Sequence, residues 1–162
     1  MTQVALVLSL LTVLMAGLMA GTFFTWSNAV MTGLDAIEPR QAIAAMRGMN
    51  DKILNPLFLA VFMLTGIVGF AAALLLWIDT RTGAAVAMFI AAGFYVLGSN
   101  GITASINVPM NNKLVAASVP DDEAAVAKMW TDFSSRWRRW NSVRALLCAV
   151  SLVMAGLSLY LY

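Results

Sequence analysis

The residues best suited to bind or transform a ligand share one face of a helix near the C-terminal end of the chain. At about 3.6 residues per turn, residues 130–144 bring six side chains within an arc of about 100°: Trp130, Phe133, Trp137, Trp140, Asn141 and Arg144. Its aromatic members predict a buried face, while Lys128, Asp132 and Arg139 take the opposite, solvated face. Because a buried amide or cation is costly unless it is paired, Asn141 and Arg144 need partners on neighbouring helices or in a ligand.

A second helical face combines the same residue types. Glu38-Pro39 predicts a helix start, with Pro39 at the first helical position. From there a cation and an amide share the apolar side of the helix: Ile43, Met46, Arg47, Asn50, Ile53 and Leu54. Asn55-Pro56 then predicts a kink or a new start where this helix enters the membrane.

The third polar region follows a run of helix-breaking residues, Gly98-Ser99-Asn100-Gly101. Residues 102–113 are rich in Asn, contain a Pro and carry no charge before the last position. We expect unwound backbone here. At membrane depth such backbone is tolerated only where it is buried in protein or lines a cavity.

The composition places these regions in a membrane protein. Of the 162 residues, 61% are apolar and 11% are charged, whereas soluble domains have about 45–50% apolar and about 25% charged residues. Four stretches are long enough to be candidate spans: residues 4–26, 53–78, 83–100 and 145–162. Residues 1–162 thus predict a single all-α domain, an integral membrane four-helix bundle with a broken segment after the third helix. The fourth helix should begin near residue 121 and extend out of the bilayer.

The basic residues predict the orientation of this bundle. With four spans, both termini and the turn at residues 79–82 share one side, which holds Arg81. The other nine of the ten Lys and Arg residues lie in or beside the two long loops, which the positive-inside rule places in the cytoplasm. We therefore expect a protein of the bacterial inner membrane with non-cytoplasmic termini. The chain start lacks basic residues, so residues 4–26 predict an uncleaved anchor.

Charge and residue types also limit the partners and cofactors. A net charge of +2, with acidic residues among the basic ones, argues against nucleic acid, and Arg136, Arg138 and Arg139 suit lipid headgroups. The chain has no His, and its one Cys, Cys148, lies inside the fourth span. Haem, copper, zinc and iron–sulfur sites are therefore improbable, and no nucleotide-binding motif is present. We expect no cofactor and no metal.

Polar residues from four parts of the chain fall at the cytoplasmic end of the predicted bundle. The candidate ligand-binding residues are Asn28, Arg47, Asn50, Asn107, Asn111, Asn112, Trp137, Asn141 and Arg144. Each alone has a structural interpretation, since Trp favours interfaces, Asn caps helices and Arg reaches headgroups. Because they share faces with apolar residues, we favour a polar pocket. We expect Arg144 to be buried and to donate to an Asn side chain or a carbonyl of residues 107–112, with Asn141 beside it.

Four strings in these regions carry a resemblance to a known family. They are residues 20–31 (AGTFFTWSNAVM), the pair Met46 and Asn50, residues 107–112 (NVPMNN) and residues 137–144 (WRRWNSVR). Together they resemble the anthrone oxygenase-like family of small four-span membrane proteins, most of which have no known function. The resemblance covers nearly the whole chain.

The resemblance implies oxidation of an anthrone to an anthraquinone by molecular oxygen, without metal or flavin. It implies that Trp137 stacks on the rings and that the phenolic oxygens are bound by Asn107, Asn111, Asn141 and Arg144. Family members often carry His after the Trp-Asn pair, where this chain has Ser142, so that candidate base is absent.

Two functions remain open at this point. The first is a cofactor-free oxygenase acting on an anthrone-like, quinone-like or other flat phenolic molecule. The second is a non-enzymatic membrane protein, either a small-ligand binder or an accessory subunit of a larger membrane complex. The lack of an assured base favours the second slightly, and no residue is assigned a catalytic role.

Overall fold

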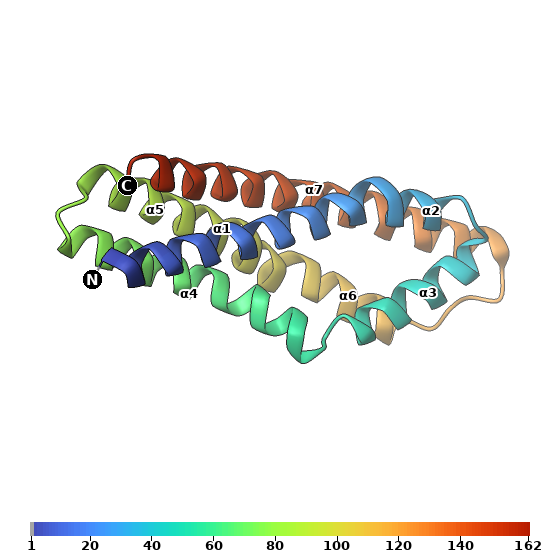
Figure 1. Cartoon of the computed structure of the whole chain (residues 1–162). Coiled ribbons are helices and arrows are strands. Elements are labelled where there is room, and N and C mark those ends of the chain that lie inside the picture. The colour runs from blue at the N-terminus through green and yellow to red at the C-terminus, as the bar shows by residue number, and fades with distance from the viewer. Residues whose placement is uncertain (1) are drawn as a thin grey trace.

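The computed structural model describes residues 2–162 and is built from helices. Four helices lie side by side, with both ends of the chain at the same end of the bundle (Figure 1): α1 (Thr2–Thr25), α4 (Pro56–Ile78), α5 (Thr82–Tyr95) and α7 (Glu123–Tyr160). Four stretches are long and apolar enough to cross a membrane: Gln3–Asp35, Pro56–Ile78, Thr82–Ala116 and Glu123–Tyr160. The chain is therefore an integral membrane helical bundle, which confirms the predicted fold class.

The half of the bundle that holds the chain ends, called the terminal half below, is packed with small residues. Its buried core consists of Ala5, Ala72, Ala73, Leu76, Ala84, Ala85, Met88, Ala91 and Ala155. A Cβ added at Gly69 of α4 would lie 3.1 Å from the Cβ of Ala92, so α4 and α5 approach closely. Ser151 and Ser158 of α7 donate hydrogen bonds to the carbonyl oxygens of Ala91 and Ala84, at 2.8 and 2.7 Å. These bonds join α7 to α5.

The other half, called the distal half below, has bulkier side chains. It contains α2 (Met31–Asp35), α3 (Pro39–Lys52), α6 (Val108–Ala116) and the first part of α7, with α2 lying along α7 and α3 along α6 (Figure 1). Its core consists of Met31, Leu34, Ala42, Ile43, Met46, Leu114, Val126, Trp130, Phe133 and Trp137. The aromatic face predicted on α7 supplies three of these side chains.

The helix starts follow the expected chemistry. Pro39 takes the first position of α3, where its missing N–H leaves no intrahelical bond unmade. Asn55 caps α4 and accepts a hydrogen bond from Phe58 N at 3.0 Å, so the chain restarts here as predicted. Asp122 caps α7 and accepts from Ala125 N at 2.8 Å. From this cap α7 continues for 38 residues through the predicted fourth span.

The predicted unwound segment after the third helix is instead helical. Between α5 and α6 lie two π-helical segments, η2 (Val96–Gly101) and η3 (Thr103–Asn107), and a third, η1 (Trp26–Val30), separates α1 from α2. The departure from α geometry is thus a widening of the turns. A widened turn keeps backbone groups paired within the helix, which the bilayer requires of unshielded backbone. Gly98 permits the close packing, because a Cβ there would lie 2.4 Å from the Cβ of Leu147.

Candidate functional site

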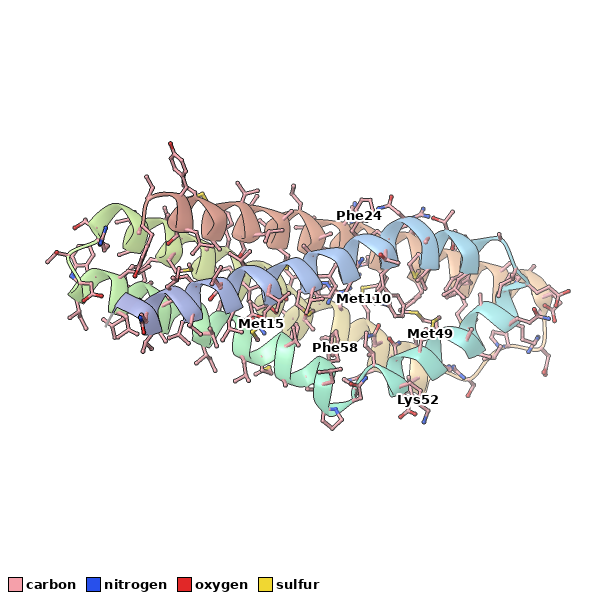
Figure 2. The ribbon with its side chains drawn as sticks, viewed as in Figure 1. Met15, Phe24, Met49, Lys52, Phe58 and Met110 are labelled. Atoms are coloured by element: carbon pink, nitrogen blue, oxygen red, sulfur yellow. The ribbon has the colours of Figure 1, made fainter. Side chains whose placement is uncertain are left out.

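A cavity of about 340 Å³ lies where the widened helices meet the α3–α4 junction and α7. It is lined by Phe23, Trp26, Arg47, Asn50, Asp51, Ile53, Leu54, Phe58, Thr103, Asn107, Val108, Asn111, Asn112, Val115, Trp137, Asn141 and Arg144. Figure 2 shows Phe58 on the inner side of α4, while Lys52 at the end of α3 points away from the bundle. Eight of the nine sequence-predicted residues therefore share one cavity, and their binding of a ligand stays a prediction.

Asn28 is the one predicted ligand-binding residue that does not line the cavity. Its side chain is exposed and its Nδ2 donates to the carbonyl oxygen of Phe24 at 3.0 Å, within its own helix. Trp26, two positions earlier, lines the cavity. Because Asn28 follows Trp26 by two residues, its side chain lies roughly half a turn around the helix from that of Trp26 and points outward.

Arg144 is buried, with 5% of its surface exposed. Its two terminal nitrogens donate to Thr103 Oγ1 at 2.7 Å and to Asn141 Oδ1 at 2.6 Å. Its guanidinium carbon also lies 4.2 Å from the centroid of the Phe23 ring. The expected position of Asn141 is confirmed, but the expected partner in residues 107–112 is wrong. Thr103 replaces it because the widened turn of η3 brings this hydroxyl to α7.

Asn141, three residues before Arg144 on α7, orients the Arg144 guanidinium. It is fully buried, and its Nδ2 donates to the Phe23 carbonyl oxygen and to Ser27 Oγ, both at 2.7 Å. Its Oδ1 accepts from Arg144. Both amide hydrogens are thus used within the protein, so this side chain serves mainly to hold α1 against α7 and to fix the guanidinium.

Arg47 holds the wall of the cavity together. It donates from Nε and a terminal nitrogen to the Leu114 carbonyl oxygen, at 3.0 and 2.7 Å, and to the Ala117 carbonyl oxygen at 2.6 Å. These carbonyls end α6, where the helix dipole favours a cation. Arg47 therefore ties α3 to α6.

Two tryptophans and an asparagine shape another part of the wall. Trp137 donates from Nε1 to Asn111 Oδ1 at 2.8 Å. Its ring lies 5.5 Å from that of Trp26, centroid to centroid, with 49° between the planes. The pair offers large aromatic surfaces, and the indole N–H of Trp137 is already paired, which suits contact with a flat aromatic molecule.

Several polar atoms around the cavity have no partner. Among the described residues, six buried side-chain nitrogen and oxygen atoms lack a hydrogen bond, and four of them belong to cavity residues. They are Nδ2 and Oδ1 of Asn107, Nδ2 of Asn50 and Nε of Arg144. Asn107 is 1% exposed and has neither amide atom paired. Leaving such groups unpaired costs about 1–3 kcal/mol each, so a ligand or water that satisfies them gains that amount.

The cavity wall contains one carboxylate, that of Asp51. It is exposed and pairs with Lys52 at 2.8 Å, and this contact raises the pKa of Lys52. Ser142, the departure from the resembled family, does not line the cavity but donates to Ser27 Oγ at 2.9 Å and to the Arg138 carbonyl. A base at position 142 would therefore lie outside this cavity. In residues 2–162 no three His, Cys, Asp or Glu side chains gather as metal ligands would.

Sequence reasoning missed two of the groups that complete the site. Thr103 belongs to the polar stretch 102–113, but the predicted ligand-binding residues of that stretch are its three Asn; the Thr103 hydroxyl, at helical spacing from Asn107, could have been included. Phe23 contributes a ring and a backbone oxygen, and a backbone oxygen has no side-chain signal in the sequence.

The fold and the cavity define a class: a four-span helical membrane protein with an aromatic-walled polar cavity at one end of the bundle. Residues 52–154 match the family described as anthrone oxygenase, and the chain belongs to that family. The matched region includes Thr103, Asn107, Asn111, Trp137 and Arg144 of the cavity. No curated protein and no solved structure matches the chain significantly.

Proposed function

We propose that the cavity binds a flat aromatic molecule with phenolic or quinone-like oxygens, and that the protein oxidises an anthrone-like substrate with molecular oxygen, without a cofactor. The observation that carries this proposal is the set of unpaired polar atoms that belong to residues lining an aromatic-walled cavity. Asn107 offers one acceptor and one donor, while Asn50 and Arg144 offer further donors. A phenol donates to the Asn107 oxygen, and a phenolate or carbonyl oxygen accepts from the nitrogens.

The charge of the cavity supports an anionic form of the ligand. Arg144 is a buried cation whose hydrogen-bond acceptors, Thr103 and Asn141, are neutral, and no ion pair to it occurs within residues 2–162. An uncompensated buried cation stabilises a nearby anion strongly because little water screens it. A deprotonated anthrone, whose charge spreads onto oxygen, has the required chemistry.

The proposed reaction balances without a metal or flavin. The methylene carbon of the anthrone loses two hydrogens and gains a carbonyl oxygen, and the second oxygen atom of O₂ leaves as water. The carbanion supplies the electrons directly to O₂. The protein needs to orient the anion and stabilise it, and Asp51 is the carboxylate on the wall that accepts the first proton.

Binding and oxygen uptake test this proposal with one matched pair of variants. Dithranol added to the purified protein in nanodiscs should quench tryptophan fluorescence and accelerate O₂ uptake, with EDTA present throughout. Asn107→Leu should weaken dithranol binding about tenfold, as expected for two lost hydrogen bonds, while Asn28→Leu, outside the cavity, should not. Equal affinity in the two variants would overturn the cavity assignment.

The second candidate is a binder or accessory subunit without turnover. The exposed position of Asp51 favours it, because the cavity wall contains no carboxylate shielded from water. Quenching by dithranol that depends on Asn107, with O₂ uptake no faster than in empty nanodiscs, would select this candidate over the oxygenase.

The proposal includes a location and an orientation. We place the protein in a bacterial inner membrane with the distal half at the cytoplasmic side, because nine of ten basic residues lie at or near that half. An alkaline phosphatase fused to the C-terminus should be active and a fluorescent protein fused there dark. The reverse pattern would contradict the orientation.

A further inference from the structure

We infer that the ligand carries a long hydrocarbon tail, which leaves the cavity sideways and lies in a membrane-facing groove between α4 and the widened segments η2 and η3. This inference rests on the proposed function, since the cavity must hold the polar aromatic head. It names the ligand class more closely, as a flat phenolic substrate, or its quinone product, bearing a prenyl-like chain.

The groove is a second cavity, of about 570 Å³, adjacent to the first. It is lined by Phe62, Met63, Gly66, Ile67, Phe70, Val96, Asn100, Thr103, Ala104 and Val108. Thr103 and Val108 line both cavities. On the α4 side, the ring of Phe58 in the first cavity stacks on that of Phe62 in the groove, with centroids 5.7 Å apart. These four side chains form the boundary that the tail of a molecule in the cavity would cross to enter the groove.

The groove presents hydrocarbon despite its two polar residues. Asn100 donates from Nδ2 to the Phe62 carbonyl oxygen at 3.2 Å, and Tyr95 donates to the same oxygen at 3.0 Å. The Thr103 hydroxyl accepts the bond from Arg144. Because Asn100 Nδ2 and Thr103 Oγ1 are engaged within the protein and the other lining residues are apolar or Gly, the groove offers little to a polar headgroup and suits an apolar chain.

The position of the groove gives the direction of the tail. On α4 it extends from Phe62 to Phe70, eight residues or about 12 Å along the helix, toward the interior of the span. Its rim residues Met63 and Ile67 are 55% and 62% exposed on the outer, lipid-facing surface of α4. A tail here is covered by protein on one side and by lipid on the other, so the head enters the cavity from the bilayer.

The close approach of α4 and η2 forms the floor of the groove. A Cβ added at Gly66 would lie 2.5 Å from Cγ2 of Val96, so α4 and η2 are in contact at the floor of the groove, under the proposed hydrocarbon tail. A compact tricyclic molecule confined to the first cavity would leave this groove to membrane lipid. The alternative occupant is therefore a phospholipid acyl chain, which has no head in the cavity.

Photolabelling separates the two occupants. The tailed probe is menadione bearing a prenyl chain with a diazirine, the competitor is menadione, and the lipid probe is phosphatidylcholine with a diazirine on one acyl chain. At ten times its Kd, measured by tryptophan quenching, menadione should reduce labelling of groove residues by the tailed probe about tenfold. Labelling by the lipid probe should not change. Tailed-probe labelling that menadione fails to reduce, or that falls outside the groove, overturns the inference.

A pair of variants tests the groove itself. Ala104→Phe fills the groove from an exposed position, and Ala71→Phe adds the same ring at an exposed position of α4 outside it. The first should lower groove labelling several-fold while menadione still quenches; the second should change neither. If menadione quenches tryptophan fluorescence and the tailed probe labels Ala104→Phe as strongly as the wild type, the tail assignment fails and the proposed function stands. If menadione and dithranol both fail to quench, the proposed function fails.

Discussion

The buried serines of the terminal half and Asn107 of the distal half differ in how their polar atoms are paired. In the terminal half, the hydroxyls of Ser9, Ser151 and Ser158 each donate to a helix carbonyl, at 2.7–2.8 Å. In the distal half, Asn107 is equally buried and neither of its amide atoms is paired. These three serines are thus paired where helices pack, whereas Asn107 is unpaired where a cavity opens. This difference is the basis of the proposal that buried polar groups stabilise the first half and bind a ligand in the second.

The backbone follows the same division. In the terminal half α1, α4, α5 and α7 keep regular α geometry, whereas η1, η2 and η3 all lie toward the distal half. Widened turns shift side chains out of the regular helical register, and they are frequent at functional sites. Here they bring Thr103 and Asn107 to the same cavity as Trp26.

The largest effect should come from Arg144→Lys. A lysine cannot donate to Thr103 and Asn141 with the planar fork of arginine, and its ammonium is harder to desolvate. We expect the affinity for dithranol to fall about a hundredfold, because the ligand loses one charge-assisted hydrogen bond and the fixed geometry of the arginine fork. Titration of tryptophan fluorescence measures it. An unchanged affinity would show that the cation of the distal half is structural, as the serines of the terminal half are.

Gly98→Ala should cost about 1–3 kcal/mol of unfolding free energy, because the added methyl would overlap Leu147 and force η2 away from α7. Gly93→Ala is the matched control in α5, where nothing lies within 4 Å of the added Cβ. There the substitution should stabilise the helix by up to about 1 kcal/mol. Thermal unfolding in detergent compares them. Equal effects would mean that the close packing of η2 is not required.

Ser151→Ala should have a small but definite effect. It removes the bond to the Ala91 carbonyl and should lower the unfolding free energy by about 0.6 kcal/mol, the average for such bonds in membrane proteins. Dithranol affinity should not change, since Ser151 lies in the terminal half. A loss of affinity without a loss of stability would break the division between the halves.

Much of the distal half could be predicted because its signals are local. Helix starts at Pro39 and Asn55, and the polar stripe on α7, follow from caps and from helical periodicity. Convergence on one cavity followed from the four-span topology. The π-helical segments could not be predicted, because the Gly-rich run after Tyr95 reads equally as a break, and packing against α7 decides the outcome. The exchange of partner for Arg144 is a consequence of those widened turns.

The unfolding free energy of ligand-free Asn107→Leu tests the central claim most directly. Leucine has nearly the shape of asparagine and removes two buried polar atoms that have no partner in the protein. If Asn107 exists for a ligand, the variant should be as stable as the wild type or more stable, and it should bind dithranol weakly. A loss of about 1 kcal/mol or more with dithranol binding intact would contradict the account, because Asn107 would then be a structural residue like Ser151.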